Sequence, residues 1–274
     1  MTVIASNTAA LRAQNGSRMA NNALNTAMAR LSSGNRINSA SDDAAGLAIS
    51  NTMQSQINGM NQGIRNSNDG ISLAQTADGS LDEVTSMLQR IRELAVQSAS
   101  GTYSSDDRDN MQTEVTQLTQ QIGSIVNTTQ FNGVNVFGTS GAGGTTTIQT
   151  GANAADTVDI VISGSLASLS SLTVTITGTD GTTANSALST IDGYVKTVNS
   201  VRAGLGASES QLNSAVNNMT NDVTNLTDAK SRISDADFST ETTNLAKAQI
   251  LSQASTAMLA QANQSQQGVL KLLQ

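Results

Sequence analysis

Between residues 191 and 233, every seventh position of the chain holds an apolar residue. A second ladder with the same spacing runs from Met53 to Ala95 and includes a serine and alanines among its members. A seven-residue apolar repeat of this length predicts long helices that wind around a partner, rather than a compact enzyme core. Because about a hundred residues separate the two ladders, we expect the chain to fold back and supply its own partner. The predicted central seam consists of Met53, Ile57, Met60, Ile64, Ile71, Leu81, Leu88, Leu205, Leu212, Met219 and Leu226.

The composition excludes several classes of enzyme. Apolar residues make up 37% of the chain and charged residues 13%, against roughly 45–50% and 25% in typical soluble domains. With two tyrosines, three phenylalanines and no tryptophan, the chain has too few large rings for a conventional globular core. It has no cysteine and no histidine, so thiolate metal sites, disulfides and histidine-based hydrolysis are excluded. We therefore expect no enzymatic activity and no cofactor.

The charge is unevenly distributed. Residues 1–41 contain four arginines and no acid, residues 42–230 contain 18 acids against 7 bases, and residues 231–274 contain three of each. The acidic bulk argues against nucleic-acid binding. A basic start without acids resembles an organelle-targeting segment, but its apolar spacing favours an amphipathic packing helix. No apolar run approaches the ~20 residues of a membrane span, and no signal peptide is expected.

Helical spacing and capping residues predict five helices. The first covers residues 1–33 and ends at Gly34, since glycine commonly terminates a helix. Ser41 and Ser105, each followed by two aspartates, are expected to cap helices over about 42–98 and 105–127. The last two helices are expected at 187–233 and beyond residue 240. Ser80 and Glu83 offer an alternative capping box beside Gly79, but the unbroken register of the ladder favours one continuous helix.

Residues 138–186 are rich in glycine, threonine and serine and contain no lysine or arginine. Their β-branched runs at 145–150, 157–163 and 172–177 predict short antiparallel strands. The expected fold is therefore mainly α, a long antiparallel coiled-coil-like helical bundle. Its N- and C-terminal halves are nested, and a small antiparallel β-sheet lies at mid-chain.

Seven ordered segments at both ends of the chain resemble bacterial flagellins. They are residues 30–46 (RLSSGNRINSASDDAAG), 68–72 (NDGIS), 88–97 (LQRIRELAVQ), 130–133 (QFNG), 231–237 (SRISDAD), 248–251 (AQIL) and 258–263 (MLAQAN). The resemblance implies a structural subunit that self-assembles into the flagellar filament, the propeller for swimming. It implies export through the flagellar type III pathway and an extracellular location. The partners implied are other copies of the chain, an export chaperone, and filament cap and hook-junction proteins.

The resemblance also implies a domain organisation. Residues 1–41 and 234–274 would form the inner filament core, and residues 42–137 and 187–233 the surrounding helical tube. Residues 138–186 would be a small β region in place of variable outer domains, so the chain resembles a minimal flagellin. Many relatives carry a proline within the segment matching 264–269 and end in arginine, and this chain does neither.

Two sets of apolar residues follow from this resemblance. The implied filament-core residues are Leu11, Leu24, Met28, Leu31, Leu245, Leu251, Met258, Leu259, Val269, Leu270 and Leu273. The implied contacts with the export chaperone are Ile250, Leu251, Leu259, Val269 and Leu270. The last helix has apolar residues on more than one face, and such a helix alone in water exposes surface that invites association. The alternative is a core helix of a monomer.

A further motif resembles the patch by which many flagellins are detected by Toll-like receptor 5. Its residues are Gln89, Arg90, Arg92, Glu93, Leu94, Gln97 and Glu114. The alternative is a face that packs against neighbouring subunits, and both roles are compatible if assembly buries the patch.

Other features have simpler interpretations. Asp235 and Asp237 hint at a calcium loop, but the glycine and the distal ligand of such loops are missing, which favours a turn. The glycines of 138–144 lack the Gly-Lys-Ser/Thr of a phosphate loop. Serines and threonines of 139–186 are either glycosylated or simply solvated. The alternative function is a flagellin-like cell-surface adhesin or binding protein.

Overall fold

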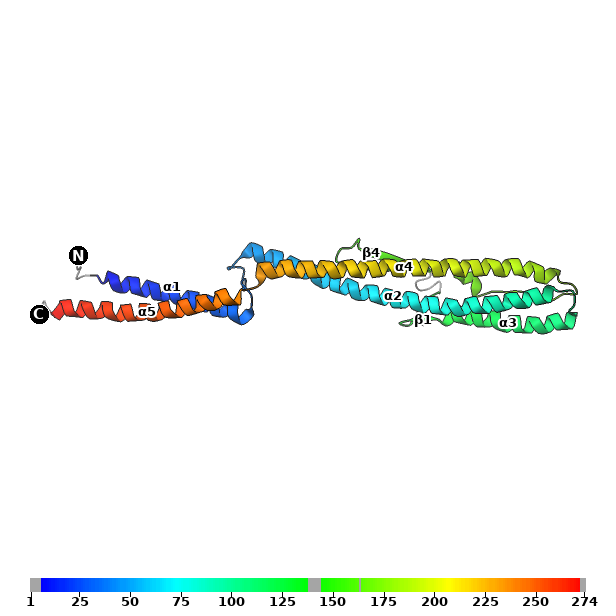
Figure 1. The fold of residues 1–274 in the computed structure, drawn as a ribbon, viewed down its shortest axis with the longest axis horizontal. Coiled ribbons are helices and arrows are strands. Elements are labelled where there is room, and N and C mark those ends of the chain that lie inside the picture. The colour runs from blue at the N-terminus through cyan, green and yellow to red at the C-terminus, as the bar shows by residue number, and fades with distance from the viewer. Residues whose placement is uncertain (1–5, 138–143, 163, 272–274) are drawn as a thin grey trace. The chain divides into compact units, whose positions relative to one another are not determined.

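The computed structural model describes residues 6–137, 144–162 and 164–271. Its contacts divide the chain into two compact units. Unit 1 combines Met1–Ser55 with Asn225–Gln274, and unit 2 is Gln56–Thr224. Two long helices, α2 (Ala44–Ala99) and α4 (Thr182–Ser234), contribute residues to both units. The predicted mainly α fold with nested N- and C-terminal halves is confirmed (Figure 1).

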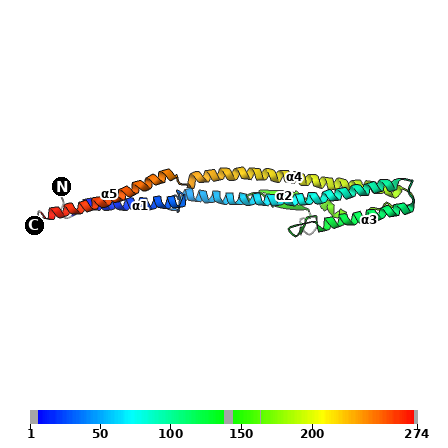
Figure 2. The same cartoon turned by 60° about the horizontal axis from the view of Figure 1, so that its bottom comes forward.

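In unit 1, α1 (Thr8–Ser33) and α5 (Phe238–Lys271) lie side by side and run antiparallel (Figure 2). The side chain of Asn7 caps α1 by accepting a 2.9 Å hydrogen bond from the backbone N–H of Ala10. At the other end Gly34 adopts a φ of 72°, a left-handed conformation that favours glycine and stops the helix. The expected helix over 1–33 thus begins at residue 8, and residues 1–5 lie outside the described part.

The cap of α2 differs from the one expected. Asp43, rather than Ser41, caps the helix, since its Oδ1 accepts a 2.8 Å hydrogen bond from the N–H of Gly46. Asp42 accepts hydrogen bonds from the N–H groups of Asn38 and Ser39, which hold the pKa of its carboxyl below its usual value. The prediction of one continuous helix through Gly79 is confirmed.

The cap of α3 (Ser105–Thr128), in unit 2, differs from the expected one as well. It is Ser104, one residue before the expected Ser105. Ser104 and Asp107 form a reciprocal capping box, in which each side chain bonds the other's backbone N–H. The pKa of Asp107 is lowered, chiefly because the Ser104 hydroxyl and N–H both donate to its carboxylate. The sequence Ser104-Ser105-Asp106-Asp107 offers two serines, and only the first has an acid at the third helical position.

Two small antiparallel sheets follow α3. Strands β1 (Gln130–Phe131) and β2 (Val134–Asn135) form a two-residue hairpin. Its loop residues, Asn132 and Gly133, have φ values of 51° and 77°. Positive φ at both positions is what the tightest hairpin turn requires, and it explains the Asn-Gly pair.

The second hairpin joins β3 (Thr145–Gln149) to β4 (Thr157–Val161). It packs closely on α2, because a Cβ atom at Gly63 would lie only 2.5 Å from the carbonyl oxygen of Thr150. A short 3₁₀ helix, η1 (Gly164–Leu169), comes next. The two predicted strands at 145–150 and 157–163 are therefore present within these bounds.

The third predicted strand, at 172–177, is wrong. Its side chains do alternate, with Leu172, Val174 and Ile176 buried and Thr173 and Thr175 between them exposed. However, the backbone bonds a side chain instead of a strand. Gln112 donates to the carbonyl of Val174 and accepts from the N–H of Ile176. The segment therefore has a strand's burial pattern without a ladder, and α4 begins at Thr182 rather than at 187.

The core of unit 2 lies where α3, the β3–β4 hairpin and the 164–176 segment cover α2 and α4. Leu81 and Leu88 of α2 and Leu205 and Leu212 of α4 are fully buried there. Ion pairs between the two helices border this core, with Arg202 of α4 joined to Asp78 and Asp82 of α2 at 2.8 and 2.9 Å. The apolar ladders thus form the spine of a self-contained unit.

Candidate assembly surfaces

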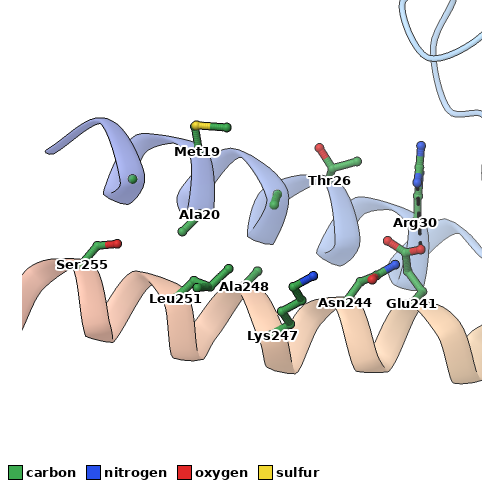
Figure 3. Close-up of a pocket in the computed structure, with 12 residues that line it drawn as sticks. Met19, Ala20, Thr26, Arg30, Glu241, Asn244, Lys247, Ala248, Leu251 and Ser255 are labelled. Atoms are coloured by element: carbon green, nitrogen blue, oxygen red, sulfur yellow. Dashed lines mark ion pairs between the residues drawn. The ribbon is translucent and has the colours of Figure 1, made fainter. Parts of the chain in front are cut away.

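The interface between α1 and α5 is lined by small side chains. Ala20 and Ala27 of α1 and Ala248 and Ala262 of α5 are buried there. At Gly16, an added Cβ would lie 3.2 Å from the hydroxyl of Ser255, so the two helices approach closely. Figure 3 shows this narrow interface, with Ala20 and Ala248 between the two helices and Met19 pointing away from α5.

Polar contacts fix the register of the pair along its length. Asn7 donates to the carbonyl of Ala262, and Ser252 donates to the side chain of Asn21 at 3.0 Å. Near the connectors, Arg30 lies 4.0 Å from Glu241. The guanidinium of Arg36 donates to the carbonyl of Ile233. The backbones of Asn35 and Asp235 form an isolated antiparallel β-bridge. The connector between α1 and α2 is therefore bonded to the end of α4 and to the connector between α4 and α5.

Seven large apolar side chains of this helix pair face outward. Leu11 is 62% exposed, Met258 63% and Phe238 68%. The other large apolar side chains of α1 and α5 with high exposure are Met19, Met28, Ile250 and Leu251. Exposed apolar residues gathered on one element mark an interaction surface. The small residues hold the two helices together, and the large residues remain available to another molecule.

The implied filament-core residues divide according to this geometry. Leu11, Met28, Leu251 and Met258 are exposed, whereas Leu24, Leu31, Leu245 and Leu259 are half-buried. The backbone of Val269 and Leu270 belongs to α5, while their side chains and the whole of Leu273 lie outside the described part. Among the implied chaperone contacts, Ile250 and Leu251 are exposed.

The predicted central seam is not uniformly buried. Ile57 and Met219 are almost fully covered, whereas Met60, Ile64 and Ile71 are half-buried. Met53 and Leu226, also half-buried, belong to unit 1 rather than unit 2. Full burial is confined to the stretch that α3 and the mid-chain segments cover.

The candidate receptor patch separates into two parts. Arg90 joins Glu114 of α3 at 2.8 Å and Glu93 at 3.1 Å, so these three charges form one exposed cluster. Arg92 instead pairs with Asp192 of α4 at 2.7 Å. The remaining members behave differently from one another: Gln89 is exposed, Gln97 donates to the hydroxyl of Tyr103, and Leu94 is only 2% exposed in the core.

The two aspartates near residue 236 are occupied by local donors. Asp235 accepts hydrogen bonds from the hydroxyls of Ser231 and Ser234. Asp237 accepts from the Thr240 hydroxyl and from the N–H groups of Ser239 and Thr240 at the start of α5, and these bonds lower its pKa. Both carboxylates thus act as turn and cap acceptors.

Family models match both halves of the chain. Residues 4–142 match the bacterial flagellin N-terminal helical region, and residues 188–273 match the C-terminal helical region. The chain belongs to the flagellin family. A flagellin of Halalkalibacterium halodurans is 43% identical over 90% of each chain. The flagellar filament 33 kDa core protein of Treponema phagedenis is 40% identical over 90% of this chain and 91% of its own.

A solved structure agrees with this membership. The crystal structure of Bacillus cereus flagellin covers 57% of this flagellin and 88% of its own chain, with 29% identity and a TM-score of 0.50. Flagellins are structural filament proteins that act outside the cell, so this flagellin is a self-assembling structural subunit rather than an enzyme. Within the described ranges, none of its helices is long and apolar enough to cross a membrane.

Two features of the structure were not predicted from the sequence. The small-residue interface was missed because the predictions relied on large apolar residues, yet its signal is a seven-residue repeat as well. Ala13, Ala20 and Ala27 repeat in α1, and the matching positions of α5 are Glu241, Ala248, Ser255 and Ala262. The second feature is the buried Arg108, which no periodicity in the sequence distinguishes from a solvated arginine.

Proposed function

We propose that this flagellin is the building block of a bacterial flagellar filament, assembled by burial of the outward face of its terminal helix pair. The observation that carries the proposal is the division of side chains in unit 1, with alanines between α1 and α5 and large apolar residues exposed. Seven large apolar side chains on two adjacent helices, 47–69% exposed, provide a driving force for association, since burying a fully exposed side chain of this kind contributes about 1.5–3 kcal/mol.

The proposed layers follow the two units only approximately. We assign residues 1–41 and 234–274 to the inner core and residues 42–137 and 187–233 to the surrounding tube. Residues 138–186 stand in place of outer domains. The compact units divide at Ser55 and Asn225, inside α2 and α4. On this proposal, the first turns of α2 and the last turns of α4 lie against the inner layer, because they share a unit with the α1–α5 pair.

Export through the flagellar type III pathway fits the same surface. A subunit with an exposed apolar helix pair would associate prematurely inside the cell, so a chaperone has to cover Ile250, Leu251, Leu259, Val269 and Leu270 until export. The filament cap and the hook-junction proteins are the partners proposed for the two ends of the filament. The final location is extracellular.

Electron microscopy of the purified chain tests the proposal. Concentrated monomer should grow into long tubes of uniform diameter. The adhesin alternative instead predicts discrete particles that bind a cell or matrix surface without forming tubes. Particles that never polymerise under any seeding condition would remove the filament assignment.

Oxidation with hydrogen peroxide gives an independent footprint of the buried surface. Among the methionines in the described part of the monomer, we expect Met19, Met28 and Met258, all exposed, to be oxidised fastest to the sulfoxide. In the filament they should react as slowly as the buried Met111. Peptide mass spectrometry follows each residue, and Met111 is the internal control in both states. Unchanged reactivity of the three after assembly would contradict burial of this face.

We also propose that the exposed cluster of Arg90, Glu93 and Glu114 is recognised by Toll-like receptor 5 when the subunit is monomeric. Arg90→Asp reverses the charge at the centre of the cluster. It should raise the monomer concentration needed for half-maximal reporter-cell activation by roughly tenfold or more. Lys196→Asp, an exposed charge reversal on α4, is the control. Equal activation by the Arg90→Asp monomer would exclude this cluster.

A further inference from the structure

Three asparagines of the chain are followed directly by glycine, in the pairs Asn15–Gly16, Asn58–Gly59 and Asn132–Gly133. Asparagine is a thermolabile residue because it loses its side-chain amide spontaneously. The loss is fastest before glycine, which has no side chain to shield the backbone nitrogen that attacks the amide. Since the three pairs share this local chemistry, their surroundings in the fold decide which of them reacts.

Two of the pairs lie inside helices, Asn15–Gly16 in α1 and Asn58–Gly59 in α2. The N–H of each glycine is held by the carbonyl four residues earlier in its helix. Both glycines also lie close to other elements. A Cβ atom at Gly16 would lie 3.2 Å from the hydroxyl of Ser255, and one at Gly59 would lie 2.8 Å from the Cβ of Ala152. Reaction at either pair therefore requires a long, packed helix to open.

The third pair lies at the tip of the β1–β2 hairpin, where Asn132 and Gly133 are both exposed. Apart from its chain neighbours, a Cβ atom at Gly133 would meet no described atom within 4 Å. Within the described ranges, neither the side chain of Asn132 nor the N–H of Gly133 has a hydrogen-bond partner. The attacking nitrogen and the amide that it attacks are therefore both accessible to water and to hydroxide.

The hairpin restrains this pair only weakly. Its ladder consists of two residue pairs, Gln130 with Asn135 and Phe131 with Val134, and hairpins of two strands are marginally stable on their own. Ring closure needs the backbone around Asn132 to rotate, so the turn has to open before the nitrogen of Gly133 reaches the side-chain carbon. Short surface elements open with far less free energy than packed helices do.

We propose that Asn132 is a modification site, at which the folded chain deamidates spontaneously to aspartate and isoaspartate. The backbone nitrogen of Gly133 gives its proton to hydroxide and attacks Cγ of Asn132. The bond between Cγ and Nδ2 breaks, and Nδ2 takes a proton from water and leaves as ammonia. The inference concerns the subunit itself and does not depend on its assembly.

Water then opens the cyclic imide at one of its two carbonyls. Cleavage between the Gly133 nitrogen and Cγ gives aspartate with the normal backbone. Cleavage between that nitrogen and the main-chain carbonyl carbon of Asn132 gives isoaspartate, in which the backbone runs through the side chain. The net reaction consumes water and releases ammonia, with no change of oxidation state.

The two products should affect the hairpin differently. Asp-Gly suits the same turn as Asn-Gly, so aspartate adds a negative charge and leaves the strand pairing intact. Isoaspartate adds a methylene group to the backbone, so the turn no longer fits between Phe131 and Val134. The loosening should end at Val136, because its side chain is buried and its N–H donates to the carbonyl of Thr129 at 3.0 Å.

Peptide mass spectrometry of the full chain, aged at physiological temperature in mildly alkaline buffer, tests the site. Asn132 should deamidate at least about tenfold faster than Asn15 and Asn58 in the folded chain. The rate should rise with pH, since the attacking nitrogen has to lose its proton. In urea that unfolds the chain, the three rates should converge. Equal rates in the folded chain, or a preference for Asn132 that persists in urea, would overturn the inference.

Two variants separate the consequences of the reaction. Asn132→Gly is the matched control, because Gly-Gly also suits the turn and has no side-chain amide to lose. Asn132→Asp, measured fresh, carries the added charge without the altered backbone. Amide hydrogen exchange over residues 130–135 should be as slow in both variants as in the fresh wild type, and faster in aged chains that carry isoaspartate. Exchange that stays slow in the isoaspartate form would contradict the expected opening of the hairpin.

Discussion

Removal of residues 231–274 is expected to abolish filament formation while unit 2 remains folded. The truncation removes α5 and the carbonyl of Ile233 that Arg36 binds. The 26-residue α1 then loses the alanine face it packs against, and most of the stability of a helix in a protein comes from such packing. Unit 2 keeps its core, since residues 56–224 supply all of its buried side chains.

Three measurements check this expectation. Electron microscopy should show no tubes. Circular dichroism should show a loss of helix larger than the deleted residues account for, and denaturant unfolding should retain one cooperative transition. The matched control is the Leu251→Ser/Met258→Ser double variant, which alters two exposed side chains. It should keep the monomer stability of the wild type and weaken assembly. Tubes formed by the truncated chain would refute the role of the terminal pair.

Replacement of the buried Arg108 is expected to destabilise unit 2 strongly. The guanidinium of Arg108 is almost completely buried and donates to four backbone carbonyls, those of Ser98, Ser100, Gly178 and Thr179. It thereby closes the C-terminal end of α2 and ties it to the segment that leads into α4. Arg108→Met keeps much of the side-chain volume but leaves these carbonyls without donors, at a cost of about 3–5 kcal/mol.

Urea unfolding of the monomer measures this effect. Arg92→Met is the control, because it removes an exposed ion pair with Asp192 that contributes about 0–1 kcal/mol. Arg108→Lys should be intermediate, since an ammonium cannot reach four separate carbonyls. A free energy of unfolding within about 1 kcal/mol of the wild type for Arg108→Met would show that water satisfies the carbonyls instead.

The helices could be predicted from the sequence because their signals are local and repeated. The ladders through Leu81, Leu88, Leu205 and Leu212 predict the spine of unit 2, and their unbroken register predicts that α2 continues through Gly79. The Asn132–Gly133 turn is equally local, since it depends on two adjacent residues with positive φ.

The features that were missed depend on partners distant in the sequence. The segment 172–177 has the alternation of a strand, but whether it pairs is decided by Gln112, more than 60 residues earlier. Leu94 lies among charged residues in the sequence, yet α2 turns it into the core. Glu241 and Arg108 are charged residues in buried positions, and no pattern of hydrophobicity reveals them.

The hydrogen bonds that Arg108 donates to four backbone carbonyls bear on the conditions that the subunit tolerates. The four partners of Arg108 are uncharged backbone carbonyls, so these hydrogen bonds do not depend on a charged acceptor that salt could screen. These hydrogen bonds at the end of unit 2 are therefore expected to form equally well in dilute buffer and in brine. Contacts between opposite charges, such as the exposed Arg92–Asp192 pair, lack this independence, because salt screens them.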